Sequence, residues 1–192
     1  MANNINSEIV YKCREGNKKA MQSLYEAYKR RMLGVCLRYT NDAEEAKDLM
    51  HDGFVKVFTS LDKWKEEIPF EGWLTVVIRN NAINSIRKQG RLNFVNFEQV
   101  ENQVEYEDIN LNEKEDWIKN ISAEDAIDLI NSLPEKYKVI INLYALEGMS
   151  HKEIAEMLGT TEGTSKSQLS RARQQLIQLV RENQKKNEKI NV

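Results

Sequence analysis

The sequence predicts an all-α protein made of two small helical domains joined by a flexible acidic linker. The 192 residues include two Pro and eight Gly, too few turn-forming residues for an all-β sandwich. Hydrophobic residues make up 41% of the chain and charged residues 30%, a balance that fits neither a disordered chain nor a membrane protein. Apolar residues recur three and four positions apart in several segments, which is the spacing of amphipathic helices.

Residues 1–90 are predicted to form the N-terminal domain. Three amphipathic helices are expected there, over about residues 20–38, 43–60 and 71–89. Asp42 and Glu45 have the spacing of a capping box at the start of the second helix, and Gly90 ends the third. A polar loop with aromatic residues, 62–70, joins the second helix to the third.

Residues 91–121 are predicted to be a linker because they are rich in Asn and Glu and show little periodicity. Acidic residues dominate this segment, whereas Arg and Lys dominate residues 79–91 before it and 163–186 after it. The net charge of −2 therefore hides two basic segments on either side of an acidic one. Such a distribution favours nucleic acid as a partner of the basic segments.

Residues 122–192 are predicted to form the C-terminal domain. Ser122 resembles a cap for a first helix that ends near Leu133, and Pro134 suits the first turn of the next. That second helix should run to about Glu147, with its apolar side chains facing inward: Tyr137, Ile140, Ile141 and Tyr144.

The last part of this domain predicts a helix-turn-helix. Ser150 and Glu153 form a capping box for a short helix over 151–158, Gly159 ends it, and Thr161 can cap a second helix to about residue 181. In this motif the second helix lies in the major groove of DNA. Its polar face carries Lys, Ser and Arg, which can bind bases and phosphates. The alternative is a solvated basic face on an ordinary helical hairpin.

Compartment and chemistry follow from what the sequence lacks. No apolar run approaches the roughly 20 residues of a membrane span, and the N-terminus has no signal-peptide pattern. Cys13 and Cys36 belong to no CxxC or Cys/His cluster, so we expect reduced, buried thiols. We therefore expect a cytoplasmic protein that is not embedded in a membrane. No glycine-rich phosphate loop, GxSxG or HExxH motif occurs, so we also expect no metal site, cofactor, catalytic residue or small-molecule substrate.

Three blocks of the sequence resemble a known family. Residues 133–176, LPEKYKVIINLYALEGMSHKEIAEMLGTTEGTSKSQLSRARQQL, resemble the promoter-binding C-terminal domain of sigma factors of the extracytoplasmic-function type, in the sigma-70 family. Residues 20–58 and 70–88, which contain DLMHDGFVKVF and FEGWLTVVIRNN, resemble their N-terminal core domain. The resemblance implies a protein that binds core RNA polymerase, directs it to promoter DNA and helps to melt the duplex.

The resemblance implies that the second helix of the helix-turn-helix binds the upstream, −35-type promoter element. The residues expected to contact this element are Thr164, Lys166, Ser167, Gln168, Ser170, Arg171 and Arg173.

The helix over 71–89 and the loop before it are implied to bind the strand-separated −10-type element, whose bases can be stacked and hydrogen-bonded. The residues expected there are Arg79, Asn80, Asn81, Asn84, Arg87 and Lys88. Asn84 stands where the family often has Asp. Trp64 and Phe70, on the loop, could equally line a base pocket or belong to the core, whereas Trp73 is expected in the core.

The helix over 43–60 is implied to dock on the clamp helices of the largest polymerase subunit. The residues expected to make this contact are Asp48, Leu49, His51, Asp52, Val55 and Lys56. Acids beside an apolar surface can meet basic side chains of a partner helix, although spacing alone favours a solvated helix face. His51 and Gly53 depart from the Gln and the apolar residue usual at these positions.

Three further expectations concern partners and alternatives. The resemblance makes an inhibitory anti-sigma factor a candidate partner. It implies an acidic linker that threads through the polymerase interior, and a flexible tether explains the same residues equally well. The alternative function is a stand-alone dimeric helix-turn-helix regulator, which should bind duplex DNA specifically without polymerase. A pure adaptor protein would leave the basic helix unexplained.

Overall fold

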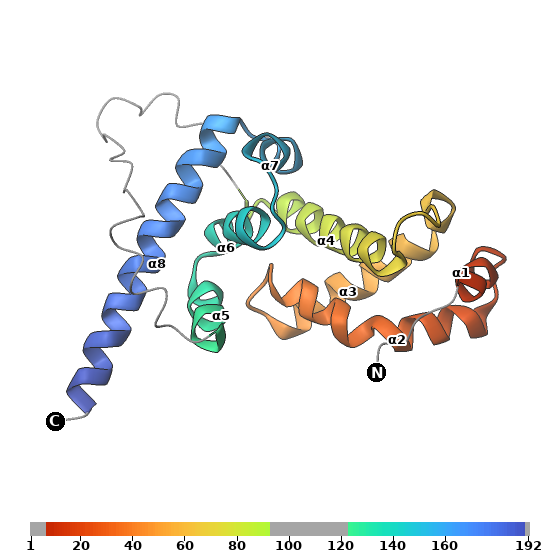
Figure 1. Cartoon of the computed structure of the whole chain (residues 1–192), viewed down its shortest axis with the longest axis horizontal. Coiled ribbons are helices and arrows are strands. Elements are labelled where there is room, and N and C mark those ends of the chain that lie inside the picture. The colour runs from red at the N-terminus through yellow and green to blue at the C-terminus, as the bar shows by residue number, and fades with distance from the viewer. Residues whose placement is uncertain (1–6, 93–122, 191–192) are drawn as a thin grey trace. The chain divides into compact units, whose positions relative to one another are not determined.

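The computed structural model describes residues 7–92 and 123–190, and both stretches are helical with no strand (Figure 1). The prediction of an all-α protein is therefore confirmed. The chain divides into two compact units, Met1–Arg91 (unit 1) and Leu92–Val192 (unit 2). Nearly all of the predicted acidic linker lies outside the described residues.

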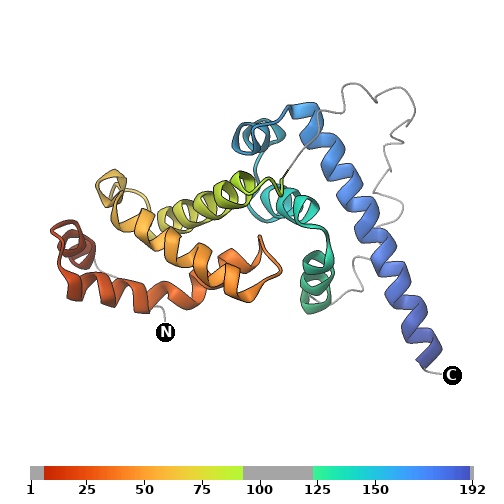
Figure 2. The same ribbon diagram turned by 180° about the vertical axis from the view of Figure 1, so that it is seen from behind.

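Unit 1 is built around three long helices that pack on one another, as Figures 1 and 2 show from opposite sides. A shorter helix precedes them and a 3-10 turn interrupts the loop before the last. In chain order the elements are α1 (Ser7–Arg14), α2 (Lys18–Leu37), α3 (Ala43–Phe58), η1 (Leu61–Lys63) and α4 (Phe70–Lys88). The three predicted helices are confirmed to within two residues at each end.

Helix α1 was not predicted, because it is only 8 residues long and buries just Val10 and Cys13, too few for a periodic pattern. Cys13 and Cys36 are free and buried, as expected. Burial raises the pKa of the Cys36 thiol to about 12, so this side chain acts as a small apolar group in the core.

Half of the capping box predicted at α3 forms. The Asp42 carboxylate accepts hydrogen bonds from the backbone N–H groups of Glu44 and Glu45, which satisfies two donors of the first turn. The Glu45 side chain does not return to the Asp42 backbone. It accepts hydrogen bonds from Thr40 and Arg91 instead, and so joins the start of α3 to the residues that follow α4.

Gly53 allows α3 and α4 to approach closely. A Cβ atom at this position would lie 3.0 Å from Cγ1 and 3.4 Å from Cα of Ile78 on α4. A larger side chain would therefore push against the backbone of the neighbouring helix, and the packing of unit 1 explains a glycine that helix propensity disfavours.

Replacing Gly53 by Leu is expected to lower the free energy of unfolding of unit 1 by about 1–2 kcal/mol, because overpacking outweighs the gain in helix propensity. Gly34→Leu on α2 is the matched control, since nothing lies within 4 Å of a Cβ there. That change should stabilise the unit slightly. Urea unfolding followed by tryptophan fluorescence measures both, because Trp64 and Trp73 belong to unit 1. Equal effects of the two substitutions would contradict the packing argument.

Unit 2 contains a helix-turn-helix preceded by two short helices. Its elements are α5 (Ala123–Ser132), α6 (Glu135–Ile141), the π-helical turn η5 (Asn142–Leu146), α7 (His151–Leu158) and α8 (Glu162–Ile190). Helix α8 extends beyond the predicted end near residue 181, as its length in Figure 2 illustrates. The cap expected at Ser122 lies outside the described residues.

The helix predicted to run to about Glu147 does reach Leu146, but its last five residues form a π turn instead of an α-helix. The π turn widens the helix after Ile141, which rotates the side chains that follow relative to an α-helix. Ile140 and Ile141 are buried as expected and Tyr137 is half-buried, whereas Tyr144, which was expected to face inward, is exposed. Gly148, with a φ of +66°, allows the chain to turn towards α7.

The helix-turn-helix of α7 and α8 forms as predicted. The Ser150 hydroxyl accepts a hydrogen bond from the backbone N–H of Glu153, and the Glu153 carboxylate accepts one from the N–H of Ser150. Gly159 ends α7 in the left-handed conformation. The Thr161 hydroxyl accepts a hydrogen bond from the N–H of Thr164 at 3.1 Å, which caps the start of α8.

Candidate nucleic-acid and protein interfaces

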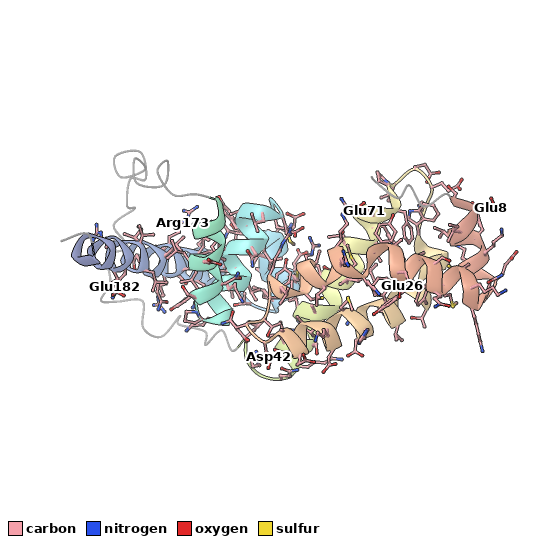
Figure 3. The ribbon with its side chains drawn as sticks, turned by 90° about the horizontal axis from the view of Figure 1, so that it is seen from below. Glu8, Glu26, Asp42, Glu71, Arg173 and Glu182 are labelled. Carbon is pink, nitrogen blue, oxygen red and sulfur yellow. The ribbon has the colours of Figure 1, made fainter. Side chains whose placement is uncertain are left out.

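Helix α8 presents part of the predicted −35 set on its outer face. Lys166 is exposed, and Ser167, Ser170, Arg171 and Arg173 are half-buried; Figure 3 labels Arg173. The structure does not bring the remaining two residues to this face. Thr164 is buried and its hydroxyl is hydrogen-bonded to that of Thr161, and Gln168 is 1% exposed. Their role in base contacts is the part of the prediction that the structure does not support.

Lys166 is the most accessible cation of this set. Its ammonium group lies 2.8 Å from the carboxylate of Glu162, one turn earlier, and its side chain is 60% exposed. This ion pair lowers the pKa of Glu162. Exposed ion pairs of this kind contribute little to stability. Lys166 can therefore leave Glu162 and bind a phosphate or a base at a small cost in free energy.

His151 joins α7 to α8 in a contact that the sequence did not reveal. Its Nδ1 lies 3.0 Å from the hydroxyl of the buried Ser165. Tyr144 stacks on the imidazole with the ring centroids 4.9 Å apart, and the Arg173 guanidinium lies 5.5 Å from the Tyr144 centroid. The π turn is the reason that sequence reasoning missed this cluster, since α-helical spacing turns Tyr144 inward.

The pKa of His151 is lowered from its ordinary value of 6.5, by burial first and by the positive charges of Lys166 and Arg173, while Glu162 opposes the shift. The unfolded chain therefore binds a proton more tightly than the folded one. The stability that the neutral imidazole confers is present in full above pH 6.5 and is lost as the pH falls through the lowered pKa of the folded state.

We expect the thermal unfolding temperature of unit 2 to fall when the pH is lowered from about 7.5 to about 5, and the fall to be smaller in His151→Gln. Thermal unfolding followed by circular dichroism tests this expectation. Both proteins keep His51, the second histidine of the chain, so the comparison isolates the effect of His151. An identical pH dependence in the variant would contradict the proposed environment of His151.

Helix α4 presents most of the predicted −10 set on one side. Asn84, Arg87 and Lys88 are exposed, and Asn80 and Asn81 are half-buried. Arg79 does not share this face. It is 7% exposed, lies on the buried stripe of the helix, and its Nε donates a hydrogen bond to Oδ1 of Asn80 at 3.1 Å. Arg79 is therefore placed to hold Asn80 rather than to meet a phosphate.

The aromatic residues before α4 form a packed layer. Trp64 and Phe70 are buried, with their ring centroids 5.3 Å apart, and the Trp64 indole N–H donates to the carbonyl of Ile68 at 2.9 Å. Of the two readings left open by the sequence, the structure favours the core over a base pocket. Trp73 packs on Phe70 but is half-buried, less enclosed than expected.

Helix α3 presents a continuous outer face that contains five residues of the predicted polymerase-binding set. Asp48, His51, Asp52 and Lys56 are exposed, and Val55 is 63% exposed. Leu49 is 3% exposed and belongs to the core, so the structure does not place it on this face. An exposed apolar side chain among acids is suited to a helix of a partner protein.

Tyr25 on α2 supports this face and was missed by sequence reasoning. Its hydroxyl lies 2.9 Å from Nε2 of His51, and its ring contacts Phe54 edge to face at a centroid distance of 4.8 Å. Because Tyr25 belongs to the apolar stripe of α2, the sequence did not indicate that it contacts His51. His51 is thus held by a neighbouring helix.

The helix-turn-helix and its basic outer face define a DNA-binding transcription factor. Comparison with protein-family models matches residues 24–92 to sigma-70 region 2 and residues 123–176 to sigma-70 region 4. The chain belongs to the sigma-70 family of RNA polymerase sigma factors, and it is of the extracytoplasmic-function type.

Individual relatives extend over most of the chain. The RNA polymerase sigma-H factor of Pseudomonas aeruginosa is 27% identical over 178 residues, which cover 87% of this chain and 89% of the relative. The ECF RNA polymerase sigma-E factor of Haemophilus influenzae is 29% identical over 174 residues, 88% of this chain and 91% of the relative. Among solved structures, the sigma factor RpoE of Bartonella quintana in complex with the anti-sigma factor NepR is 21% identical, with a TM-score of 0.48 over 85% of this chain and 98% of that chain.

As a sigma factor of this type, the protein binds core RNA polymerase and directs promoter-specific initiation of transcription. None of the helices in residues 7–92 and 123–190 combines the length and the hydropathy of a membrane span. Among the same residues, no group of three His, Cys, Asp or Glu side chains is arranged to hold a metal ion.

Proposed function

We propose that the two units divide the work of initiation. Unit 1 binds core RNA polymerase through α3 and the unpaired −10 element through α4, and unit 2 binds the duplex −35 element through α8. The observation that carries this proposal is the distribution of exposed side chains over two separate compact units. Acids surround an apolar residue on α3, whereas amides and cations line the outer sides of α4 and α8.

The polymerase contact is proposed for the outer face of α3, which consists of Asp48, His51, Asp52, Val55 and Lys56. The carboxylates would meet basic side chains of the clamp helices of the largest polymerase subunit, and Val55 would be buried between the two proteins. Charge complementarity of this kind sets the orientation and the rate of association, and desolvation of Val55 adds affinity.

The −10 contact is proposed for Asn80, Asn81, Asn84, Arg87 and Lys88 on α4. An amide side chain donates and accepts hydrogen bonds, as the edge of an unpaired base does, and the cations bind the phosphates of the strand. Arg79 enters this proposal only as a side chain that orients Asn80.

The −35 contact is proposed for Lys166, Ser167, Ser170, Arg171 and Arg173 on α8. Arg171 would bind a guanine edge, and Arg173, farther along the helix, would bind a phosphate. Thr164 and Gln168 would act by shaping the start of α8 from within.

Three further aspects belong to the same proposal. The protein would contribute binding and positioning but no catalytic group, because nucleotide transfer takes place on the polymerase. It would act in the cytoplasm, where polymerase and promoters are found. An anti-sigma factor that covers the outer faces of α3 and α8 is a candidate partner, because both surfaces must be accessible for initiation.

Transcription in vitro tests the proposed function. Core RNA polymerase is incubated with a library of genomic fragments in the presence and absence of this protein, and the start sites are mapped. We expect new start sites, each preceded by two elements at a constant spacing. The absence of new start sites, together with tight duplex binding by the protein alone, would favour the stand-alone regulator.

A further inference from the structure

Arg14, the last residue of α1, binds the loop that leads into α4. Its Nε donates a hydrogen bond to the carbonyl of Leu61 at 2.9 Å, and its Nη2 donates one to the carbonyl of Trp64 at 2.6 Å. The guanidinium carbon also lies 5.6 Å from the centroid of the Trp64 ring and 5.1 Å from that of Tyr11. One side chain thus engages two backbone carbonyls and two aromatic faces.

The contact reaches α4 through the interior of this loop, residues 61–69, which we call the Arg14 loop. Trp64 is 5% exposed. Its indole N–H donates to the carbonyl of Ile68, and its ring meets Phe70, the first residue of α4, edge to face. A displacement of the loop backbone at Trp64 would therefore be transmitted to the start of α4.

The outer side of the Arg14 loop is suited to an unpaired nucleic-acid strand. The exposed charged residues of this loop are two cations and three acids, Lys63, Lys65, Asp62, Glu66 and Glu67, and Ile68 is 46% exposed. A cation can bind a phosphate, an apolar side chain can cover the face of a base, and a carboxylate can accept a hydrogen bond from an exocyclic amino group. Base discrimination by such groups depends on where the loop backbone holds them.

We propose that Arg14 is a positioning residue for recognition of the −10 element: it fixes the Arg14 loop from the inner side, so that the loop and the first turns of α4 present one surface to the unpaired bases. The inference rests on the proposed function of α4. It adds a residue of α1 that lies outside the expected binding sets and the residues matched to the family models.

The chemistry of the contact requires an arginine. A planar guanidinium can donate to two carbonyls while it stacks on an aromatic ring, whereas an ammonium group has neither the planar shape nor the same donor geometry. Arg14→Lys should keep the charge and part of the contact with the loop. Arg14→Ala should release both carbonyls.

The test compares promoter discrimination in transcription with core polymerase, using promoters substituted singly in the −10 or the −35 element. In Arg14→Ala we expect the preference for the best −10 base to fall by about tenfold, with the preference at the −35 element unchanged. Arg14→Lys should lie between this variant and the wild type. Lys12→Ala is the matched control, since Lys12 lies on the same helix and pairs with Glu8, and it should retain wild-type discrimination.

A second readout separates positioning from general stability. Hydrogen exchange should increase at the amides of the Arg14 loop in Arg14→Ala and not in α2 or α3. Unchanged −10 discrimination, or an equal loss at both promoter elements, would overturn the inference while the proposed function stands. If Arg14→Ala does not fold, Arg14→Lys takes its place, and wild-type discrimination together with faster loop exchange in that variant would overturn the inference. A wild-type protein that starts no transcription would overturn the proposed function and this inference with it.

Discussion

Reversing the charge of Asp52 is expected to weaken the association with core RNA polymerase by about 100-fold. Asp52 is exposed on α3, in the middle of the face that also carries Asp48 and Val55. An Arg at this position would place a positive charge against the basic side chains that we propose on the clamp helices. Docking would also remove water from this new charge without giving it a partner. Gel filtration or fluorescence anisotropy with labelled protein measures the association.

Asp62→Arg is the control for this experiment. Asp62 is also exposed and belongs to the same unit, but it lies on η1 rather than on α3. The Asp62→Arg substitution changes the net charge by the same amount as Asp52→Arg. It should leave the affinity for core RNA polymerase within a fewfold of the wild type. Normal assembly by a folded Asp52→Arg protein would exclude the outer face of α3 as the docking surface.

Removing Lys166 or Arg171 is expected to reduce occupancy of the −35 element by about tenfold each, with binding to core polymerase unchanged. A phosphate contact and a base contact differ in salt dependence and in specificity, so the two substitutions should change different properties of DNA binding. Lys166→Ala should reduce the slope of log affinity against log salt by about one if it binds a phosphate. Arg171→Ala should relax the base preference at one position.

Arg181→Ala is the matched control for these variants. Arg181 lies on α8 and is exposed, but it is beyond the segment matched to sigma-70 region 4. DNA binding by polymerase assembled with each variant, measured by footprinting over a salt titration, gives both the affinity and the slope. A parallel loss of polymerase binding in Lys166→Ala or Arg171→Ala would contradict the division of work between the two units.

Local signals in the sequence were sufficient for most of the fold. The Ser150–Glu153 capping box, the Gly159 end and the Thr161 cap act within a few residues, and so the sequence predicts both ends of α7 and the start of α8 almost residue by residue. Helix α1 was not predicted because it is stabilised by the tertiary packing of Val10 and Cys13 and has no periodic pattern of its own.

The candidate sites were predictable in outline but not in every side chain. A residue-type argument places Arg79 with the other cations of α4, yet its position on the helix puts it on the buried stripe with Ile78 and Ala82. Gln168 and Leu49 are buried as well. Contacts between distant segments of unit 1, such as Tyr25 with His51 and Arg14 with Trp64, join residues 26 and 50 positions apart, and no spacing rule within one helix predicts them.

The most direct test of the account is the affinity of the protein for one of its promoters, measured with and without core polymerase at the same salt concentration. If the two units act as parts of one initiation complex, the protein alone should bind the duplex weakly and the assembled holoenzyme should bind at least about 100-fold more tightly. Tight, specific binding by the protein alone, with no change when core polymerase is added, would contradict the account and identify a stand-alone regulator.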